Sequence, residues 1–230
     1  MTDKPSRSTD PRSQPFSDTE VAVNTSRRRL TGAGLGVSAI FTLASRPVLA
    51  AHCTSASAAV SGNLSQHGTP LTCTGRSPGY WKQHPESWPS PYLPGKCEKD
   101  CNKTENWSSN SVNATLFHPV FYGDKFFADL DSNPITVKTS LSMMQVLKMN
   151  DGSNPWGLED GDNLGAHIVA ALLNAASGKT KNALTESNVK TMWQECQMKG
   201  YFEPLAGVKW YPPQVVEYIV STFEHKVFKK

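Results

Sequence analysis

The 230-residue chain has few charged residues and no long apolar run. Charged residues make up 19% of the sequence and apolar residues 38%, which excludes a disordered polyelectrolyte, a coiled coil and a polytopic membrane protein. Its 16 glycines are far too few for a collagen-like fibre, in which about every third residue is glycine. The sequence therefore predicts one globular domain of ordinary size, or one domain with a loop-rich appendage.

The small positive net charge of +3 belongs to the first fifty residues. They hold seven of the 23 basic residues and four of the 20 acidic residues, so residues 51–230 carry sixteen of each. Arg76 is the single arginine of this neutral part. A protein that binds duplex nucleic acid needs a surplus of lysine and arginine to displace counterions from phosphates. The charge balance therefore argues against nucleic acid as a partner.

Residues 1–50 have the features of an export signal. A polar stretch leads to three arginines at 27–29, a glycine-diluted apolar run at 30–44 and small residues up to Ala50. A charged start, a short apolar centre and a small-residue end are the parts of a signal peptide. The paired arginines favour the twin-arginine route, although Leu30 stands where that route usually has phenylalanine. We therefore predict cleavage near Ala51 and a mature chain in the periplasm or outside the cell, without a transmembrane segment. The alternative is a disordered basic tail with an uncleaved anchor helix.

The five cysteines all lie beyond the predicted cleavage site. An exported compartment favours disulfides, and an odd number leaves one cysteine unpaired or paired between chains. Cys196 falls on the apolar stripe of a predicted helix, so we expect it to be a buried free thiol. Local pairing then predicts the disulfides Cys53–Cys73 and Cys97–Cys101, although spacing alone does not prove connectivity. The sequence has no C-x2-C pair, so a metal–thiolate site is not expected.

An aromatic, proline-rich stretch at residues 76–108 contains the sequence GYWKQHPESWP at positions 79–89. Its prolines argue against a regular helix or a central strand, so we predict an ordered, irregular loop layer. In one interpretation this layer is a binding surface for a glycan, a peptide or an envelope polymer, formed by Arg76, Tyr80, Trp81, Lys82, His84 and Trp88. In the other, which we favour, the rings form a small core of their own and Arg76 holds a carboxylate.

The pattern becomes helical from about residue 139. We predict four helices, near residues 140–149, 163–176, 186–198 and 213–226. The second is apolar nearly all round and is expected to be central and buried. The third is expected to be capped by Thr185 and to end at Gly200. The fourth is expected to begin at the proline pair and to bury one face, formed by Val216, Ile219, Val220 and Phe223.

The predicted fold is therefore mainly α. A helical region, residues 109–230, packs as one domain with the irregular region rich in cysteine, tryptophan and proline, residues 51–108.

Motifs for catalysis are missing. The sequence has no G-x-S-x-G, P-loop, H-E-x-x-H or G-x-G-x-x-G motif, so no catalytic residue and no cofactor are expected. A polymer hydrolase would need His84, Glu86 and His167 in one cleft, within hydrogen-bond reach of one another or of a bridging water.

Two acidic stretches have some of the oxygen ligands of a calcium site. Residues 129–133 resemble the start of a calcium loop, but Pro134 and Ser140 replace the required glycine and bidentate glutamate. The acidic turn at 159–163 is expected to cap the second helix through Asp162 or Asn163.

Three sequence features recur together in one group of proteins. They are the twin-arginine-like leader, the motif G-Y-W-K-x-H-P-E-x-W-P at 79–89 and the motif H-x-V-A-A-L-L-N-A at 167–175, with a further likeness at 201–210. In these features the chain resembles a group of uncharacterised exported bacterial proteins. The resemblance covers most of residues 51–230 and implies a place in the bacterial envelope or outside the cell, but no activity.

The sequence thus predicts an exported protein that acts by binding or by assembly, including self-association, without catalysis. A carbohydrate-binding module and a polymer hydrolase are the alternatives.

Overall fold

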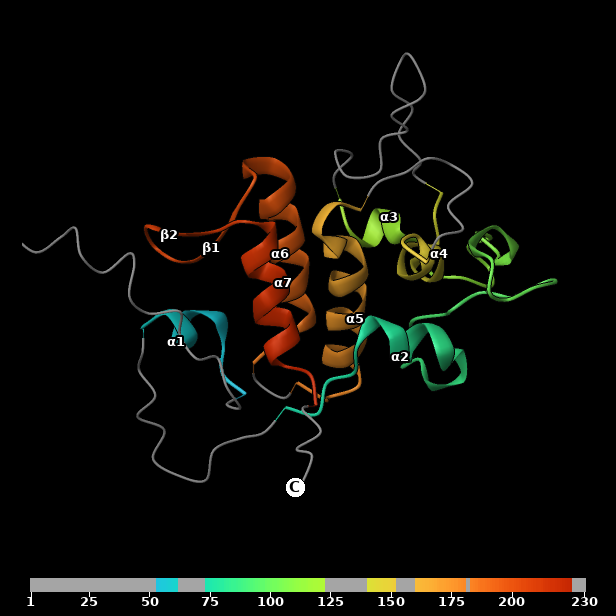
Figure 1. The fold of residues 1–230 in the computed structure, drawn as a ribbon, viewed down its shortest axis with the longest axis horizontal. Helices are drawn as coiled ribbons and strands as arrows, with labels where there is room; N and C mark the ends of the chain where they lie inside the picture. Colours follow the sequence, from blue (N-terminus) through green and yellow to red (C-terminus); the bar gives the residue numbers. More distant parts are fainter. Residues whose placement is uncertain (1–52, 62–72, 123–139, 152–159, 181–182, 225–230) are drawn as a thin grey trace, which may run out of the picture. The chain divides into compact units, whose positions relative to one another are not determined.

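The computed structural model describes residues 53–61, 73–122, 140–151, 160–180 and 183–224, all within the unit Arg46–Lys230 (Figure 1). The predicted leader and the calcium-like stretch at 129–133 lie outside these residues. The described part is mainly helical, with one small antiparallel sheet, as the sequence predicts for its fold class. None of its helices is long and apolar enough to cross a membrane.

Helix α5 (Leu164–Ala176) forms the centre of the core, as its all-round apolar sequence predicts. Its large apolar side chains are completely buried, and its alanines let neighbouring helices approach closely. Helices α6 (Glu186–Lys199) and α7 (Pro212–Ser221) lie on one side of it in Figure 1. Helices α4 (Met143–Lys148) and α2 (Pro78–Gln83) lie on the other side and also contact each other.

Helices α4 and α6 begin where their capping residues stand. Ser142 and Gln145 form a capping box, in which each side chain accepts the other residue's backbone N–H. The Thr185 hydroxyl accepts the N–H of Asn188 at the start of α6, and Gly200, with a φ of +80°, ends that helix. The predicted cap, terminator and buried stripe of α6 are therefore confirmed.

Helix α7 differs from its prediction in length and in its buried face. It begins at the proline pair as expected, but it ends at Ser221, and the buried side chains are Val215, Tyr218 and Ile219. Val220 is 37% exposed. The predicted face is confirmed for Ile219, and Val216 and Phe223 pack partly buried against the core. The prediction was wrong for Val220, and it left out Val215 and Tyr218, whose ring is buried in the core. Its hydroxyl hydrogen-bonds to main-chain carbonyls there.

The region predicted to be irregular, residues 51–108, contains short helical elements among its described residues. They are α1 (Ala56–Ser61), α2 and the 3-10 turns η2 (Pro85–Ser87) and η3 (Thr104–Asn106). Helix α3 (Phe117–Val120) follows in the region predicted to be helical. Helix α2 forms despite the nearby prolines because Ser77 accepts the N–H of Tyr80 and Pro78 occupies the first turn, where no backbone donor is needed. The prolines that follow begin η2 and prevent a longer helix.

A β-hairpin was not predicted. Strands β1 (Phe202–Leu205) and β2 (Val208–Trp210) pair antiparallel across a tight turn in which Gly207 has a φ of +82°. Strand β1 also contacts α1 and α6, so the hairpin joins the first described segment to the helical core.

Candidate functional site

A row of polar and aromatic side chains runs along the exposed side of α2. Arg76, Tyr80 and His84 follow one another at intervals of four residues. Tyr80 lies within α2, Arg76 precedes the helix and His84 is its C-cap. The guanidinium carbon of Arg76 lies 5.0 Å from the centre of the Tyr80 ring, and the Tyr80 and His84 ring centres are 4.4 Å apart. Nδ1 of His84 is 3.1 Å from Oε1 of Glu86. We call Arg76, Tyr80, His84 and Glu86 the α2 ridge.

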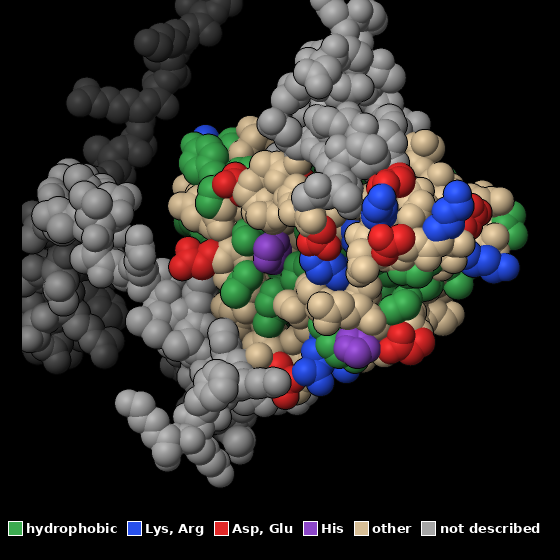
Figure 2. Space-filling model, turned by 45° about the vertical axis from the view of Figure 1, so that its right-hand side comes forward, with side chains coloured by type: hydrophobic (Ala, Val, Ile, Leu, Met, Phe, Trp, Pro, Cys, Tyr) green, Lys and Arg blue, Asp and Glu red, His purple; other side chains and the backbone are tan. Residues whose placement is uncertain are grey.

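The α2 ridge has a carboxylate at each end. Arg76 forms an ion pair with Glu224, beyond the end of α7, and Glu86 faces His84 at the other end. A backbone hydrogen bond lowers the pKa of Glu86, and His84 contributes further to that lowering. The surface view shows acidic, basic and histidine side chains intermixed on one face rather than gathered by sign (Figure 2). The ridge therefore offers paired donors and acceptors, not a field that would attract a polyanion or a polycation.

Asn174 of α5 anchors the beginning of the ridge. Its side-chain oxygen accepts the backbone N–H of Arg76 at 2.7 Å and the indole N–H of Trp81 at 3.2 Å, and its amide donates to the carbonyl of Arg76 at 2.8 Å. The side chain is fully buried. The central helix thus fixes the main chain from which the ridge projects.

Gly75 lets this main chain approach the end of α7. Its N–H donates to the carbonyl of Thr222 at 3.2 Å, and its carbonyl accepts the N–H of Glu224 at 2.8 Å. A Cβ atom at residue 75 would lie 2.6 Å from the Thr222 oxygen and 3.2 Å from the Asn174 amide. The position therefore requires glycine for space.

The structure separates the predicted binding residues into two groups. Arg76, Tyr80 and His84 are half-buried and in contact with one another. Trp81 is 1% exposed and lies in the core, so it cannot stack on a ligand in this conformation.

Trp88 and Lys82 also lie apart from the ridge contacts. Trp88 packs against the core and donates its indole N–H to the Trp81 carbonyl at 2.9 Å. Lys82 forms an ion pair with Asp151, just beyond α4.

The structure brings together two of the three residues that a hydrolase would need. His84 and Glu86 are in contact, whereas His167 has other partners. Nδ1 of His167 lies 2.8 Å from the Asn163 carbonyl, and its ring stacks with Phe223 at 6.2 Å between centres. Burial lowers the pKa of His167. With these contacts, His167 has a hydrogen-bond partner and a ring neighbour within the helical core and has a structural role there.

Asn163 holds the N-cap position of α5, as predicted, but its side chain makes no capping hydrogen bond, and the carboxylate that caps the helix is that of Asp160. Its two carboxylate oxygens accept the N–H groups of Gly165 at 2.8 Å and Ala166 at 3.0 Å. Asp162 and Asn163 have φ values of 56° and 57° and form the left-handed turn that places Asp160 below the helix start. Burial raises the pKa of Asp160 to about 6, because desolvation outweighs the two backbone hydrogen bonds.

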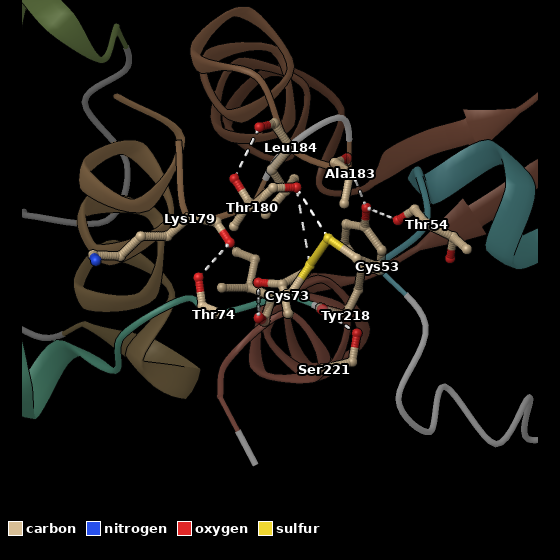
Figure 3. Close-up of a disulfide and its surroundings, with 12 residues drawn as sticks. Cys53, Thr54, Cys73, Thr74, Lys179, Thr180, Ala183, Leu184, Tyr218 and Ser221 are labelled. Carbon is tan, nitrogen blue, oxygen red and sulfur yellow. Dashed lines mark hydrogen bonds between the residues drawn. A yellow bond between two sulfur atoms is a disulfide. The ribbon is translucent and has the colours of Figure 1, made fainter. Parts of the chain in front are cut away.

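The cysteines are paired as expected. Cys53 and Cys73 are joined with their Cα atoms 4.9 Å apart, and Cys97 and Cys101 with theirs 5.6 Å apart. Figure 3 shows the first pair against the Thr180 carbonyl, with the Tyr218 hydroxyl between the carbonyls of Thr54 and Ala183, at 2.9 Å and 3.1 Å. The disulfide ties the first described segment to Cys73, and the hydrogen bond from Tyr218 to the Thr54 carbonyl ties the same segment to α7.

The free thiol of Cys196 is 3% exposed, and burial raises its pKa to about 12. It is therefore inert in the folded chain, and pairing with another chain would require α6 to open.

Among the described residues, no group of three or more histidine, cysteine, aspartate or glutamate side chains is arranged to hold a metal ion. The residues that sequence reasoning missed are Asn174, Gly75 and Glu224. The signal for Asn174 is a single amide within a helix whose other residues, apart from His167, are not polar. No local feature of the sequence indicates that Glu224 is the ion-pair partner of Arg76.

No family model matches the chain, and neither a curated protein nor a solved structure matches it.

Proposed function

We propose that the chain is an exported protein of the bacterial envelope or exterior that acts by binding a macromolecular partner through the α2 ridge, without catalysis. The observation that carries this proposal is the way the ridge is built. Its main chain is clamped by Asn174 and Gly75, while its polar ends remain accessible, with side-chain exposures of 45% for His84 and 67% for Glu86. A surface that is already ordered loses little conformational entropy on binding.

Two features favour binding over hydrolysis at this place. The His84–Glu86 pair is open to water, whereas acid–base chemistry gains most from a site that excludes it. The third residue of the hydrolase alternative, His167, is occupied by Asn163 and Phe223.

The carbohydrate-module alternative is weakened by the same geometry. Sugar recognition commonly uses exposed aromatic faces, but Trp81 is buried and the Tyr80 ring already contacts Arg76 and His84. A partner that hydrogen-bonds to Arg76, His84 and Glu86 fits the ridge better than a stacked sugar ring.

The disulfides support the exported location. Disulfides persist in oxidising compartments, and Cys53 stands two residues after the predicted cleavage site at Ala51. Cleavage there would leave a new N-terminus that is tied at once to the body of the protein.

Export is tested by expressing the full chain in a bacterium and comparing it with a variant in which Arg27 and Arg28 are both replaced by lysine. We expect the unchanged chain outside the cytoplasm, with an N-terminus near Ala51 by mass spectrometry, and the variant retained inside. Full-length chain inside the cell with every thiol free would contradict the proposal.

Binding is tested by placing a photo-crosslinking amino acid at Glu86 and, as a matched control, at Lys190, which is exposed on α6. We expect a discrete crosslinked product from position 86 that disappears when Arg76→Ala is added, and no such product from position 190. A product of twice the chain's mass would identify self-association as the form of binding. The same products from both positions, or none from position 86, would refute the role of the α2 ridge.

A further inference from the structure

The two disulfides differ in accessibility and in the length of chain that they close. Cys53 is 5% exposed and is bonded across 20 residues to Cys73, which is half-buried. Cys97 and Cys101 are only four residues apart, and Cys101 and the three residues between them are exposed. Exchange requires a thiolate to reach a sulfur atom, so exposure governs which bond reacts. By this criterion the second disulfide, which includes the exposed Cys101, is more open to exchange than the first, which includes no exposed cysteine.

The loop around the exposed disulfide is also held together by other bonds. Residues 97 and 107 form an antiparallel bridge, and the N–H of Glu98 donates to the Asn106 carbonyl at 3.1 Å. The indole of Trp107 donates to the Cys101 carbonyl at 3.0 Å, and the Asn106 amide donates to the Asp100 carbonyl at 3.0 Å. These bonds keep the two sulfur-bearing residues close without the S–S bond.

The frame of this loop is attached to the helical core. Trp107 is 6% exposed, and its carbonyl accepts the side-chain amide of Gln145 in α4 at 2.8 Å. The hydroxyl of Thr104, in η3, donates to the carbonyl of Lys148 at 3.1 Å. Reduction of the exposed disulfide would therefore leave the loop in place, with both thiols ready to reoxidise.

We propose that Cys97–Cys101 is a site of reversible thiol–disulfide exchange that is reduced by an external dithiol, while Cys53–Cys73 is a structural bond. A thiolate of the dithiol attacks Sγ of Cys101, the more exposed sulfur. The S–S bond breaks, and its electron pair leaves on Sγ of Cys97, which then takes up a proton. The second thiol of the reductant resolves the mixed disulfide and releases the Cys101 thiol. Two electrons and two protons pass to the protein, and the dithiol becomes a disulfide.

This assignment is independent of the α2 ridge, and it is tested on the purified, oxidised full chain. The chain is incubated under native conditions in dithiothreitol buffers of increasing reducing strength. It is then quenched in acid, alkylated and analysed by peptide mass spectrometry, with circular dichroism recorded in parallel. We expect Cys97 and Cys101 to become labelled together, at least about tenfold faster than Cys53 and Cys73, while the spectrum stays native. Glutathione in a parallel arm distinguishes a small monothiol from a dithiol as the effective reductant.

Two single variants test the direction of attack. With oxidised glutathione, Cys97→Ser is expected to accumulate a mixed disulfide on the exposed Cys101, because no neighbouring thiol remains to resolve it. The reciprocal variant, Cys101→Ser, is expected to react more slowly at the half-buried Cys97. Simultaneous reduction of both native disulfides, or labelling of Cys97 and Cys101 only when the native spectrum is lost, would overturn the proposal. Equal reactivity of the two variants would overturn the assigned direction.

Discussion

Asn174→Asp isolates the hydrogen-bond anchor beneath the α2 ridge. The change is nearly isosteric, and the new carboxyl still accepts from the Arg76 N–H and the Trp81 indole. It loses the amide that donates to the Arg76 carbonyl at 2.8 Å, so an ionised carboxylate at this position would set two oxygens against each other in a fully buried place. A protonated carboxyl can replace the missing donor. The variant is therefore expected to favour its protonated form when folded.

The magnitude follows from the shift in pKa. Burial and the facing carbonyl raise the pKa of a carboxyl, while the two remaining donors lower it, so we expect a net rise of about two pH units. At about 1.4 kcal/mol per unit, the variant loses about 3 kcal/mol of stability near pH 7. The pKa of the new carboxyl in the folded variant lies above its value of about 3.9 in the unfolded chain. The variant therefore keeps these roughly 3 kcal/mol of stability, about the whole loss, below about pH 4 and loses them as the pH rises to about 6.

Urea unfolding at pH 4 and at pH 7.5 measures this loss, with Asn188→Asp as the matched control. Asn188 is exposed on α6, so the control is expected to change the free energy of unfolding by less than about 0.5 kcal/mol at both pH values. An Asn174→Asp protein as stable as the wild type at pH 7.5, or equally destabilised at both pH values, would show that the anchor does not work as described.

Three further changes test the packing around the site. Gly75→Ala places a Cβ atom 2.6 Å from a backbone oxygen at the end of α7, so urea unfolding should show that the free energy of unfolding falls by about 1–3 kcal/mol. An unchanged midpoint would contradict the close approach of Gly75 to the end of α7. Tyr218→Phe removes the hydroxyl that donates to main-chain carbonyls, so we expect the free energy of unfolding to fall by about 1–2 kcal/mol and hydrogen exchange at residues 53–61 to become faster. Unaltered exchange at these residues would count against the role of the hydroxyl. Burial raises the pKa of Asp160 to about 6, above its ordinary 3.8. Between these two pH values the folded protein holds a proton on Asp160 that the unfolded chain loses. The free energy of unfolding of the wild type therefore declines as the pH rises from about 4 to 6. Asp160→Asn should remove up to about 3 kcal/mol of that decline, and parallel pH profiles for the two proteins would refute the assignment.

The longer helices were predictable because their signals are local. The apolar period and the Thr185 cap of α6 lie within one stretch of sequence, and the all-round apolar character of α5 needs no partner to be seen. The place of Tyr218 on the buried face of α7 was not predictable from the apolar pattern, because this residue combines a buried ring with a hydroxyl whose acceptors come from distant segments. The β-hairpin was missed because strands of three and four residues show no clear alternation, and one of them contains Pro204.

The candidate site was predictable in its residues but not in its connections. The motif drew attention to Arg76, Tyr80 and His84, and one sequence interpretation already gave Arg76 a carboxylate partner. Sixteen acids lie beyond residue 50, and nothing local distinguishes Glu224 among them, since the pair spans 148 residues. Whether an aromatic side chain is buried or exposed also depends on the fold, so Trp81 could not be separated from Tyr80 by sequence.

The clamp on Gly75 has a consequence for how the protein is made. The residues that complete it, at the end of α7, are synthesised long after Gly75 has left the ribosome. A nascent chain can form α2 and cap it with Ser77, but the Arg76–Glu224 pair cannot form before the last codon of the described region has been translated. A ribosome stalled within α7 would therefore hold a polypeptide whose α2 ridge lacks the Glu224 partner of Arg76, even if its other helices have formed.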